Sequence, residues 1–260
     1  MTILDKLVDY ARERTEKAKE KMPIEEIRSQ AVSATKGTFS FEKALKKPEL
    51  SFICECKKAS PSKGLISPGF PYLQIAREYE AAGTDCISVL TEPKWFLGSN
   101  KHLKKIANSV SVPCLRKDFT VDEYMIYEAK LLGASAVLLI CSILTEKQIS
   151  GFIEISDMLG LSALVEAHSE YEVEKALNAG SRIIGINNRN LNDFTVDIET
   201  GYRLRKLIPP EILFVSESGV SNAEDVKKLQ QAGVDAVLIG ETLMRAVDKK
   251  EKLTELRSLL

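Results

Sequence analysis

The sequence predicts an α/β protein: a (β/α)8 barrel, the TIM-barrel architecture, that carries an N-terminal helical extension. Two observations predict this fold. A helical segment ending in Ala-Gly or Leu-Gly repeatedly precedes a short apolar run, and eight apolar runs alternate with helical segments along the chain. Strict alternation of strand and helix indicates a parallel sheet, and eight repeats indicate that the sheet closes into a barrel.

The repeat joins the end of a helix to the start of the next strand. It occurs as EAAGTDCISVL, AKLLGASAVLLI, ALNAGSRIIGI and LQQAGVDAVLIG. In each copy a glycine follows the last helical turn, where glycine can take the left-handed conformation that ends a helix. These glycines are Gly83, Gly133, Gly180 and Gly233. The run that follows is short and apolar, as expected of a strand buried on both faces.

Eight strands and several of the helices between them can be placed in order. The strands are predicted at residues 52–57, 86–91, 112–117, 136–141, 163–166, 183–187, 213–217 and 236–240. Amphipathic helices are predicted at residues 72–83, 121–133, 145–160, 170–180 and 223–233. An open, doubly wound sheet is the alternative, but no GxGxxG motif follows the first strand, which disfavours it.

Residues 1–50 precede the first strand and have a helical pattern over 3–21 and 23–33. This segment is too long for a tail and too polar for a core element. We expect one or two extra helices that pack on the barrel and cover one of its mouths. Residues 1–260 then form a single barrel domain, since barrels of this kind typically have about 250 residues.

Composition excludes several classes of protein. The formal net charge is −1, which gives no support to nucleic-acid binding. No apolar run approaches the roughly 18 residues that cross a bilayer, and the charged N-terminus does not fit a signal peptide. Five cysteines without a CxxC motif, most of them inside apolar runs, predict buried reduced thiols. The sequence therefore predicts a cytoplasmic protein with no membrane or nucleic-acid partner.

Polar and charged residues end six of the predicted strands. In such barrels the active site lies at the carboxyl ends of the strands, so these residues should converge on one mouth. Placing many charges at one mouth costs desolvation energy and does not help a scaffold to fold. Function is the usual reason for such a cluster of charges. They are Glu55, Lys57, Thr91, Glu92, Arg116, Lys117, Asp118, Glu166, Asn187, Arg189 and Glu217.

Two glycine-containing turns predict a phosphate site. SESGV follows the seventh strand, and IGETLMR follows the eighth strand and opens a helix. Loops after these two strands commonly hold phosphate in this architecture. Gly219 and Gly240 let backbone N–H groups approach an anion closely. Glu241 is expected to contribute only its N–H, because its carboxylate must point away from a phosphate. Lys57, Lys58 and Lys63 give the first loop positive charge.

Aromatic residues follow two of the predicted strands. Phe96 and Phe119 are expected to wall an aromatic substrate, whereas ordinary loop packing explains Trp95 equally well. The two histidines, His102 and His168, form no metal-ligand pattern with any cysteine. We therefore expect both histidines to be structural or surface residues, and no metal site.

These segments together resemble the indole-3-glycerol phosphate synthase family over nearly the whole chain. The matching segments are ECKKASPSKG, LTEPKWFLGS, LRKDF, LVEAHSEYE, IGINNRNL, VSESGV and LIGETLMR, in that order. ASPSKG combined with RKDF and INNRNL is highly specific, because other phosphate-binding barrels share only the last two segments. The N-terminal helical extension is also similar. Glu241 departs from the family, in which some members have serine.

The resemblance implies a reaction of tryptophan biosynthesis. The substrate would be 1-(2-carboxyphenylamino)-1-deoxyribulose 5-phosphate, and the products indole-3-glycerol phosphate, carbon dioxide and water. An acid at the ribulose carbonyl lets the anilino ring carbon attack it. Carbon dioxide is then lost, and dehydration needs an acid and a base. No redox step occurs, so the resemblance implies neither a cofactor nor a metal.

The resemblance also implies roles for individual residues. Lys117 would be the general acid of ring closure, and Glu166 the base of the dehydration. Lys57 would bind phosphate and is a candidate second acid. The remaining implied contacts are polar partners at Glu55, Asn187 and Glu217, the substrate carboxylate at Arg189 and Ser60, the aniline ring at Phe96, Phe119, Pro61, Leu138 and Leu191, and phosphate at Ser218, Gly219, Gly240 and Glu241 by backbone.

Two other functions remain open from the sequence. One is a non-catalytic barrel that binds a phosphosugar, although binding alone would not need Lys117 and Glu166. The other is a different phosphate-binding barrel enzyme such as phosphoribosylanthranilate isomerase, whose isomerisation does not call for the ASPSKG segment. The sequence also leaves open which lysine acts in which step, and whether the chain associates with other tryptophan-pathway enzymes.

Overall fold

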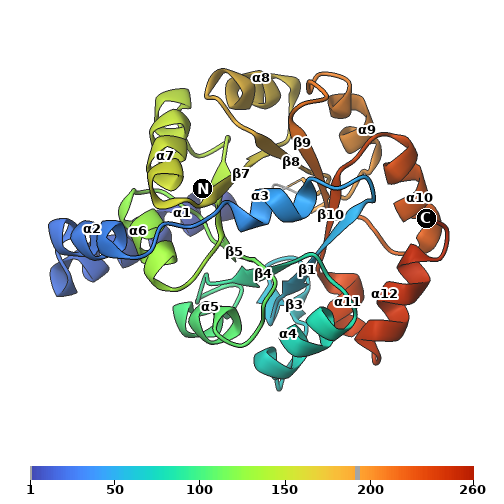
Figure 1. The fold of residues 1–260 in the computed structure, drawn as a ribbon, viewed down its shortest axis with the longest axis horizontal. Helices are drawn as coiled ribbons and strands as arrows, with labels where there is room; N and C mark the ends of the chain where they lie inside the picture. Colours follow the sequence, from blue (N-terminus) through green and yellow to red (C-terminus); the bar gives the residue numbers. More distant parts are fainter. Residues whose placement is uncertain (1, 191–193) are drawn as a thin grey trace.

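A closed barrel of parallel strands forms the centre of the protein. The structure, a computed structural model, describes residues 2–190 and 194–260. Its barrel strands follow the order β1-β10-β9-β8-β7-β6-β5-β4, and β4 pairs back with β1 (Figure 1). They are β1 (Ser51–Cys56), β4 (Cys86–Leu90), β5 (Cys114–Lys117), β6 (Ala136–Ile140), β7 (Ser162–Ala167), β8 (Ile183–Asn187), β9 (Leu213–Glu217) and β10 (Ala236–Ile239). The predicted (β/α)8 architecture is confirmed.

Each predicted strand overlaps an observed one, with small shifts at the ends. The largest is in β5, which was expected from residue 112 and begins at Cys114. Pro113 explains the shift, because proline has no N–H to give to a neighbouring strand. The glycines predicted to end helices at residues 83, 133, 180 and 233 all have positive φ angles, between 75° and 85°.

Helices surround the barrel and also precede it (Figure 1). The outer helices are α4 (Tyr72–Ala81), α5 (Asn100–Ala107), α6 (Tyr124–Leu131), α7 (Glu146–Leu159), α8 (Glu170–Asn178), α9 (Glu199–Arg205), α10 (Ala223–Gln231), α11 (Glu241–Arg245) and α12 (Lys249–Arg257). Those that precede the first strand are α1 (Ile3–Lys21), α2 (Ile24–Ser33) and α3 (Ser40–Leu45). The extension therefore has three described helices, where one or two were expected.

The two faces of each strand enter different apolar clusters. In β1, Phe52 and Cys54 pack with helix residues such as Tyr79, whereas Ile53 belongs to the cluster inside the barrel. Successive side chains of a strand point to opposite faces, so odd-numbered residues of this strand share the inner face. The same alternation directs Glu55 towards the inside of the barrel.

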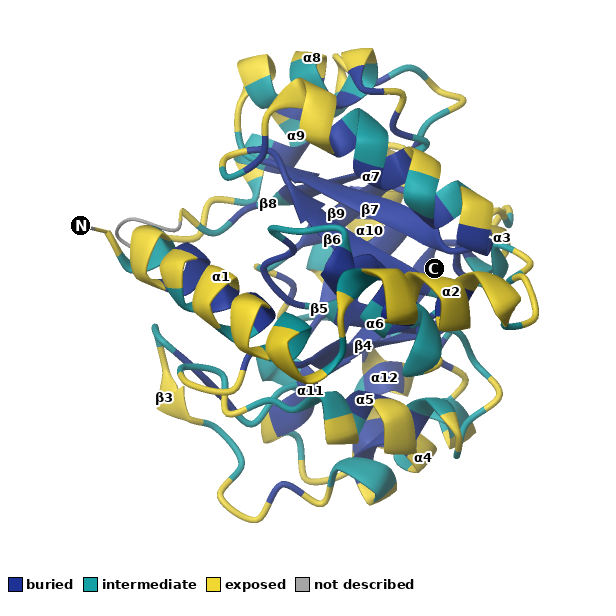
Figure 2. Ribbon diagram, turned by 90° about the vertical axis from the view of Figure 1, so that its left-hand side faces the viewer, coloured by how far each residue is buried: buried dark blue, intermediate teal, exposed yellow. Residues whose placement is uncertain are grey.

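The extension covers both mouths of the barrel. Leu7 and Ala11 of α1 join the interior cluster from the end where the strands finish, and Phe41 and Leu45 of α3 join it from the other end. Figure 2 shows α1 and α3 at opposite ends of the barrel. The backbone N–H of Glu42 donates to Ser162 Oγ at 3.2 Å, which fixes α3 to the start of β7. The expectation that the extension covers one mouth was therefore incomplete.

The first loop after β1 contains a small hairpin that was not predicted. Strands β2 (Ala59–Ser60) and β3 (Gly64–Leu65) pair antiparallel within the segment that reads ASPSKGL. Gly64 has a φ of 61°, which side chains rarely adopt. The hairpin gives the loop a fixed shape beside the carboxyl ends of the strands, on the same side as α1 (Figure 2).

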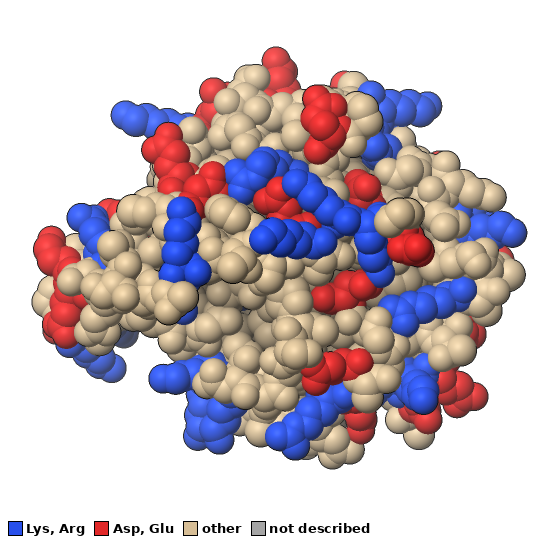
Figure 3. Space-filling model, in the orientation of Figure 1, with Lys and Arg blue, Asp and Glu red and all other residues tan. Residues whose placement is uncertain are grey.

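The surface has no dominant sign of charge on the face that carries α3. Figure 3 shows Lys and Arg interspersed with Asp and Glu there, consistent with the net charge of −1. Within residues 2–190 and 194–260, no helix is long and apolar enough to span a membrane.

Candidate active site

One cavity lies at the carboxyl ends of the barrel strands. Its volume is about 510 Å³, within the usual range of small-molecule sites. Leu191, predicted to contact the aniline ring, lies outside the described residues. The other residues to which the resemblance assigns a role all line this cavity: Glu55, Lys57, Ser60, Pro61, Phe96, Lys117, Phe119, Leu138, Glu166, Asn187, Arg189, Glu217, Ser218, Gly219, Gly240 and Glu241.

Lys117 is the centre of a buried charge cluster. It ends β5, and its Nζ lies 3.3 Å from Glu166 Oε2 and 3.1 Å from Glu217 Oε2. Burial opposes the ammonium charge, but the carboxylates of Glu217, Glu166 and Glu55 outweigh it and raise the pKa of Lys117. Lys117 therefore holds its proton at neutral pH and can give it only to a group that competes with these acids.

Glu166, at the end of β7, is held from several sides. Burial would raise its pKa, but Lys117 and His168, together with a hydrogen bond from Asn187, lower the pKa below its ordinary value. Asn187 Nδ2 donates to Glu166 Oε1 at 3.4 Å. Asn187 Oδ1 accepts from the Arg189 N–H and from Ser218 Oγ, both at 3.0 Å, so the amide is oriented with its NH2 group towards Glu166. Glu166 is thus ionised and able to accept a proton.

Glu217, at the end of β9, is the contrasting acid. Its pKa is raised to about 7: burial is the largest cause, the nearby Glu166 and Glu55 add to it, and Lys117 opposes it. Room for this side chain depends on Gly185 of β8, since a Cβ on Gly185 would meet the Glu217 carboxylate. Three acids facing two lysines leave one carboxyl group that is readily protonated, and the pKa identifies it as Glu217.

Lys57 and Glu55 form the second ion pair of the cavity. Lys57 Nζ lies 2.6 Å from Glu55 Oε1, and Ser88 Oγ donates to the other Glu55 oxygen at 3.4 Å. Burial would raise the pKa of Glu55, but Lys57 and Lys117 lower it. Gly240, which follows β10, approaches this pair so closely that a Cβ would lie 2.8 Å from Lys57 Nζ. The Lys57–Glu55 pair therefore lies directly against the backbone of Gly240, where a side chain would not fit.

The turn after β9 has an unusual backbone. Ser218 and Gly219 have φ angles of 67° and 98°, and the first of these is strained for a residue with a side chain. Two hydrogen bonds hold the turn: Asn188 Nδ2 donates to the Ser218 carbonyl at 3.0 Å, and Thr242 Oγ1 donates to the Val220 carbonyl at 2.7 Å. A strained turn at a cavity is typical of a ligand-binding segment.

Glu241 directs its carboxylate to cations rather than to the turn. Its Oε1 accepts from Arg245 Nε at 3.0 Å and lies 3.5 Å from Lys63 Nζ. Lys63 belongs to the first loop, so this contact links the β1 side of the cavity to the β10 side. Arg245 also lines the cavity, although the sequence analysis did not single it out.

Apolar residues form the opposite wall. The rings of Phe96 and Phe119 lie 6.2 Å apart, and Leu138 lies beside Phe119 in the interior cluster. Leu4 and Leu7 of α1 also line the cavity, which the sequence analysis did not predict. Their signal was the apolar face of α1, but only the position of the helix over the mouth shows what that face covers.

The loop after β8 adds two further contacts. Arg189 Nη1 donates to the Phe194 carbonyl at 3.2 Å, and Arg189 pairs with Val196 in an isolated antiparallel bridge. Phe194 and Val196 both line the cavity and were missed. Trp95 does not line it, and packs edge-on against Tyr10 of α1 at 5.7 Å.

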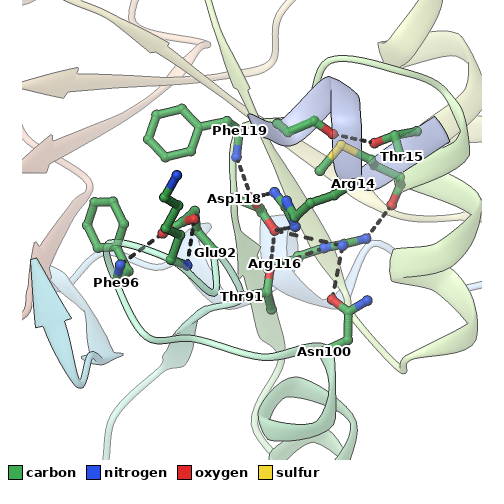
Figure 4. Close-up of polar contacts among 12 residues, drawn as sticks. Arg14, Thr15, Thr91, Glu92, Phe96, Asn100, Arg116, Asp118 and Phe119 are labelled. Atoms are coloured by element: carbon green, nitrogen blue, oxygen red, sulfur yellow. Dashed lines mark hydrogen bonds and ion pairs between the residues drawn. The ribbon is translucent and has the colours of Figure 1, made fainter. Parts of the chain in front are cut away.

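Two residues that flank Lys117 in sequence have structural contacts. Arg116 points away from the cavity and donates to Glu128 Oε2 at 2.6 Å and to Asn100 Oδ1 at 3.0 Å. The carboxylate of Asp118 binds Arg14 of α1 (Figure 4). Arg116 directly precedes Lys117 in β5 and therefore faces the opposite way, whereas Asp118 both binds Arg14 and lines the cavity.

Thr91 and Glu92, which follow β4, also have structural contacts. Thr91 Oγ1 donates to Asp118 Oδ2 at 2.5 Å. The Glu92 carboxylate accepts the backbone N–H groups of Lys94, Trp95 and Phe96, each at 2.8 Å, and so shapes the loop that presents Phe96 (Figure 4). The strand-end pattern thus includes supports of the cavity wall as well as residues that line it.

His168 was expected to be structural or on the surface, but its ring reaches the site. Its Nε2 lies 3.4 Å from Glu166 Oε1. The signal that could have revealed this contact is spacing, since residues 166 and 168 lie two apart at the carboxyl end of β7. Within the described part of the chain, no group of three or more His, Cys, Asp or Glu residues could hold a metal ion.

Comparison with known proteins identifies the family. The family model described as indole-3-glycerol phosphate synthase matches residues 4–256. This chain belongs to the indole-3-glycerol phosphate synthase family. It is therefore a carboxy-lyase of tryptophan biosynthesis that acts on a phosphorylated small molecule, as the sequence analysis predicted.

Curated relatives agree over their full length. The chain is 55% identical over 256 residues to the indole-3-glycerol phosphate synthase of Ruminiclostridium cellulolyticum, covering 98% of each chain. It is 49% identical over 270 residues to that of Lachnoclostridium phytofermentans, covering 99% of this chain and 100% of the relative. It is 50% identical to that of Endomicrobium trichonymphae, with 98% and 99% covered.

Solved structures of other enzymes support the fold alone. A 3-hexulose-6-phosphate synthase from Salmonella typhimurium superposes with a TM-score of 0.67 at 14% identity, covering 81% of this chain and 98% of that one. A thiamine phosphate pyrophosphorylase from Pyrococcus furiosus superposes with a TM-score of 0.61 at 16% identity, covering 83% and 96%.

Proposed function

We propose that Lys117 is the general acid of ring closure and that Glu166 is the general base of the dehydration. The observation that carries this proposal is the buried cluster in which Lys117 Nζ lies 3.3 Å from Glu166 Oε2. A protonated lysine and an ionised carboxylate within reach of the same cavity supply both kinds of proton transfer that the reaction needs.

Ring closure is the step that needs an acid. The anilino ring carbon forms a bond to the ribulose carbonyl carbon, and the carbonyl oxygen must accept a proton. Lys117 keeps its proton in the free enzyme because Glu217 and Glu166 hold its charge. A hydrogen bond from this ammonium group stabilises the negative charge that develops on the oxygen, in a site where burial makes the interaction strong.

Decarboxylation and dehydration follow. Loss of carbon dioxide restores the aromatic ring and needs no added proton donor. The new hydroxyl group then leaves as water after protonation, while a base removes a proton from the new five-membered ring. Glu166 is suited to be this base because its pKa is lowered, so it is ionised at neutral pH. Lys57, paired with Glu55 at 2.6 Å, is the candidate for the second acid.

Substrate binding divides the cavity into three parts. Phosphate would lie at the Ser218–Gly219 turn and Gly240, with Lys57 alongside. The aniline ring would lie between Phe96, Phe119, Leu138 and Pro61. The substrate carboxylate would lie at Arg189 and Ser60. The residues of all three parts line the same cavity. Glu55, Asn187 and Glu217 would orient the lysines and the ribulose hydroxyls, and Glu241 would offer only its backbone N–H to the phosphate.

A structure with an unreactive analogue tests the two lysine roles. The analogue carries a hydroxyl group in place of the ribulose carbonyl. We expect Lys117 Nζ within about 2.6–3.2 Å of that hydroxyl, and Lys57 Nζ at the phosphate. If Lys57 instead contacts the hydroxyl and Lys117 the phosphate end, the two assignments are exchanged.

Turnover tests whether the site as described is catalytically competent: the enzyme generates indole fluorescence from substrate, whereas a barrel that only binds the substrate does not. We further propose that the protein acts in the cytoplasm, because its five cysteines are buried and unpaired. Association with other tryptophan-pathway enzymes remains a hypothesis, tested by sedimentation of the mixed proteins.

A further inference from the structure

His168 and Glu172 form a chain of polar contacts behind Glu166. His168 Nε2 lies 3.4 Å from Glu166 Oε1, and His168 Nδ1 lies 3.4 Å from Glu172 Oε2. The same Glu172 oxygen accepts the backbone N–H of His168 at 2.7 Å. One imidazole ring therefore lies between two carboxylates, one on the cavity side and one on the side of α8.

Glu172 is itself held in place by the start of α8. The Ser169 side chain caps the helix by accepting the backbone N–H of Glu172 at 3.3 Å. Glu172 lies in the first helical turn, where a negative charge is favoured. Its carboxylate therefore has a defined position from which to orient the ring of His168.

The charge balance favours a protonated ring. The carboxyl groups that act on His168 come from different elements: Glu166 from β7, Glu172 from α8 and Glu217 from β9. Burial lowers the pKa of His168, but the hydrogen bond to Glu172 and the charge of Glu166 outweigh burial and raise it. A charged His168 would add a cation to Lys117 and Lys57, which face these acids among the described residues.

His168 contacts one oxygen of Glu166, and Lys117 contacts the other. Lys117 lies 3.3 Å from Oε2, whereas His168 lies 3.4 Å from Oε1. Nε2 is a buried atom without a well-angled hydrogen bond within residues 2–190 and 194–260. His168 is not among the described residues that line the cavity. The contact thus acts on Glu166 and not on the substrate.

We propose that His168 is a positioning residue for Glu166: its imidazolium, oriented by Glu172, holds one carboxylate oxygen so that the other stays directed at the reacting ring. This inference rests on the proposed role of Glu166 as the base. It assigns to His168, which the sequence analysis expected to be a structural or surface residue, a part in the dehydration step.

The state of the ring can be measured directly. The chain has two histidines, so the imidazole Cε1–H signals in an NMR titration are those of His102 and His168. Burial lowers the pKa of His102, which stacks on Tyr72 with ring centroids 4.4 Å apart. We expect His168 to titrate above His102. Glu172→Gln should lower the pKa of His168, because glutamine can still accept the backbone N–H but carries no charge.

Kinetics then test whether the ring acts through Glu166. His168→Gln should lower kcat by about tenfold, the equivalent of one pKa unit of lost interaction, with KM unchanged. The matched control is His102→Gln, which should keep native kcat. In a Glu166→Gln background, adding His168→Gln should cause no further loss, because residues acting on one group are not additive.

The outcomes separate this inference from the proposed function. Equal losses from His168→Gln in the native and Glu166→Gln backgrounds, or a His168 pKa at or below that of His102, overturn the inference. Native kcat in a folded His168→Gln protein overturns it as well. If Glu166→Gln alone fails to separate carbon dioxide release from indole formation, the role of Glu166 itself is wrong.

Discussion

Arg14 and Asp118 are 104 residues apart in sequence and join α1 to the end of β5. Arg14 Nη2 donates to Asp118 Oδ1 at 2.6 Å, and Arg14 Nη1 donates to Asp118 Oδ2 at 3.2 Å. Asp118 directly follows the proposed acid, Lys117 (Figure 4 shows the pair). The N-terminal helix is therefore fixed to the strand that carries the central lysine.

Arg14→Met is expected to destabilise the protein by about 3 kcal/mol, because it leaves the buried Asp118 carboxylate without its nearest cation. It should also lower kcat, since α1 supplies Leu4 and Leu7 to the cavity. Chemical denaturation measures the first effect and steady-state kinetics the second. Arg12→Met is the matched control, because Arg12 pairs with Asp9 on the exposed side of α1. Equal stability of the two variants contradicts the stabilising role of the contact between Arg14 and Asp118.

The same pair predicts a pH dependence. Burial would raise the pKa of Asp118, but Arg14 and Arg116 lower it below its ordinary value. The stability it contributes is thus present above the unfolded pKa of about 3.9 and is lost as pH falls through the lower folded pKa. Arg14→Met should show a smaller loss of stability than the native protein over that acid range.

Glu217 predicts a pH dependence of stability opposite in sign to that of Asp118. Its pKa is raised to about 7, mainly by burial, so folding favours the protonated form. Native stability should therefore fall as pH rises from the unfolded value of about 4.3 towards 7, by roughly 4 kcal/mol at most. Glu217→Gln removes this group. Melting temperatures at pH 5 and pH 8 should show the variant gaining on the native protein with rising pH, and a constant difference contradicts the assignment.

The phosphate site is tested by a pair of glycine variants. Gly219→Ala places a side chain at a φ of 98° in the proposed phosphate turn, 3.2 Å from a Val196 methyl group. Gly180→Ala has the same backbone strain at a φ of 85°, at the end of α8 and with open space around it. Both should lose about 1 kcal/mol of stability. Only Gly219→Ala should raise KM, by roughly tenfold, and an equal KM in both variants contradicts the phosphate assignment.

The two lysines are expected to affect different constants. Lys117→Met should lower kcat by roughly 10²–10⁴-fold while the fold is kept, because positioned proton transfer contributes about that much. Lys57→Met should chiefly raise KM through lost phosphate binding. Steady-state kinetics with circular dichroism as a folding check measure both. Near-native kcat in the Lys117 variant would move the acid role to Lys57.

Much of the site could be predicted because the carboxyl ends of all the barrel strands meet at one mouth. Lys117, Glu166 and Glu217 follow from that rule and from the family motifs together. Alternate residues of a strand point to the same face, so Lys117 points into the barrel while Arg116 points outward, and Glu166 and His168 lie on the same side. Both outcomes were available from spacing in the sequence.

Other features depend on long-range packing. The position of α1 over the cavity, and hence the role of Leu4 and Leu7, depends on the contact between Arg14 and Asp118 across 104 residues. The contribution of Val196 depends on its bridge to Arg189. The raised pKa of Glu217 depends first on its burial and then on the acids and lysines around it. Local patterns do not contain such information.

Glu166→Gln in a single turnover tests the central claim most directly. The amide keeps the shape of the side chain but cannot act as a base. Ring closure needs the acid Lys117, and decarboxylation follows from recovery of the aromatic ring. The variant should therefore release labelled carbon dioxide on the first turnover, while indole fluorescence, which needs the dehydration, stays low. If carbon dioxide release and fluorescence slow equally, Glu166 acts before or during ring closure, and the assignment of the base is wrong.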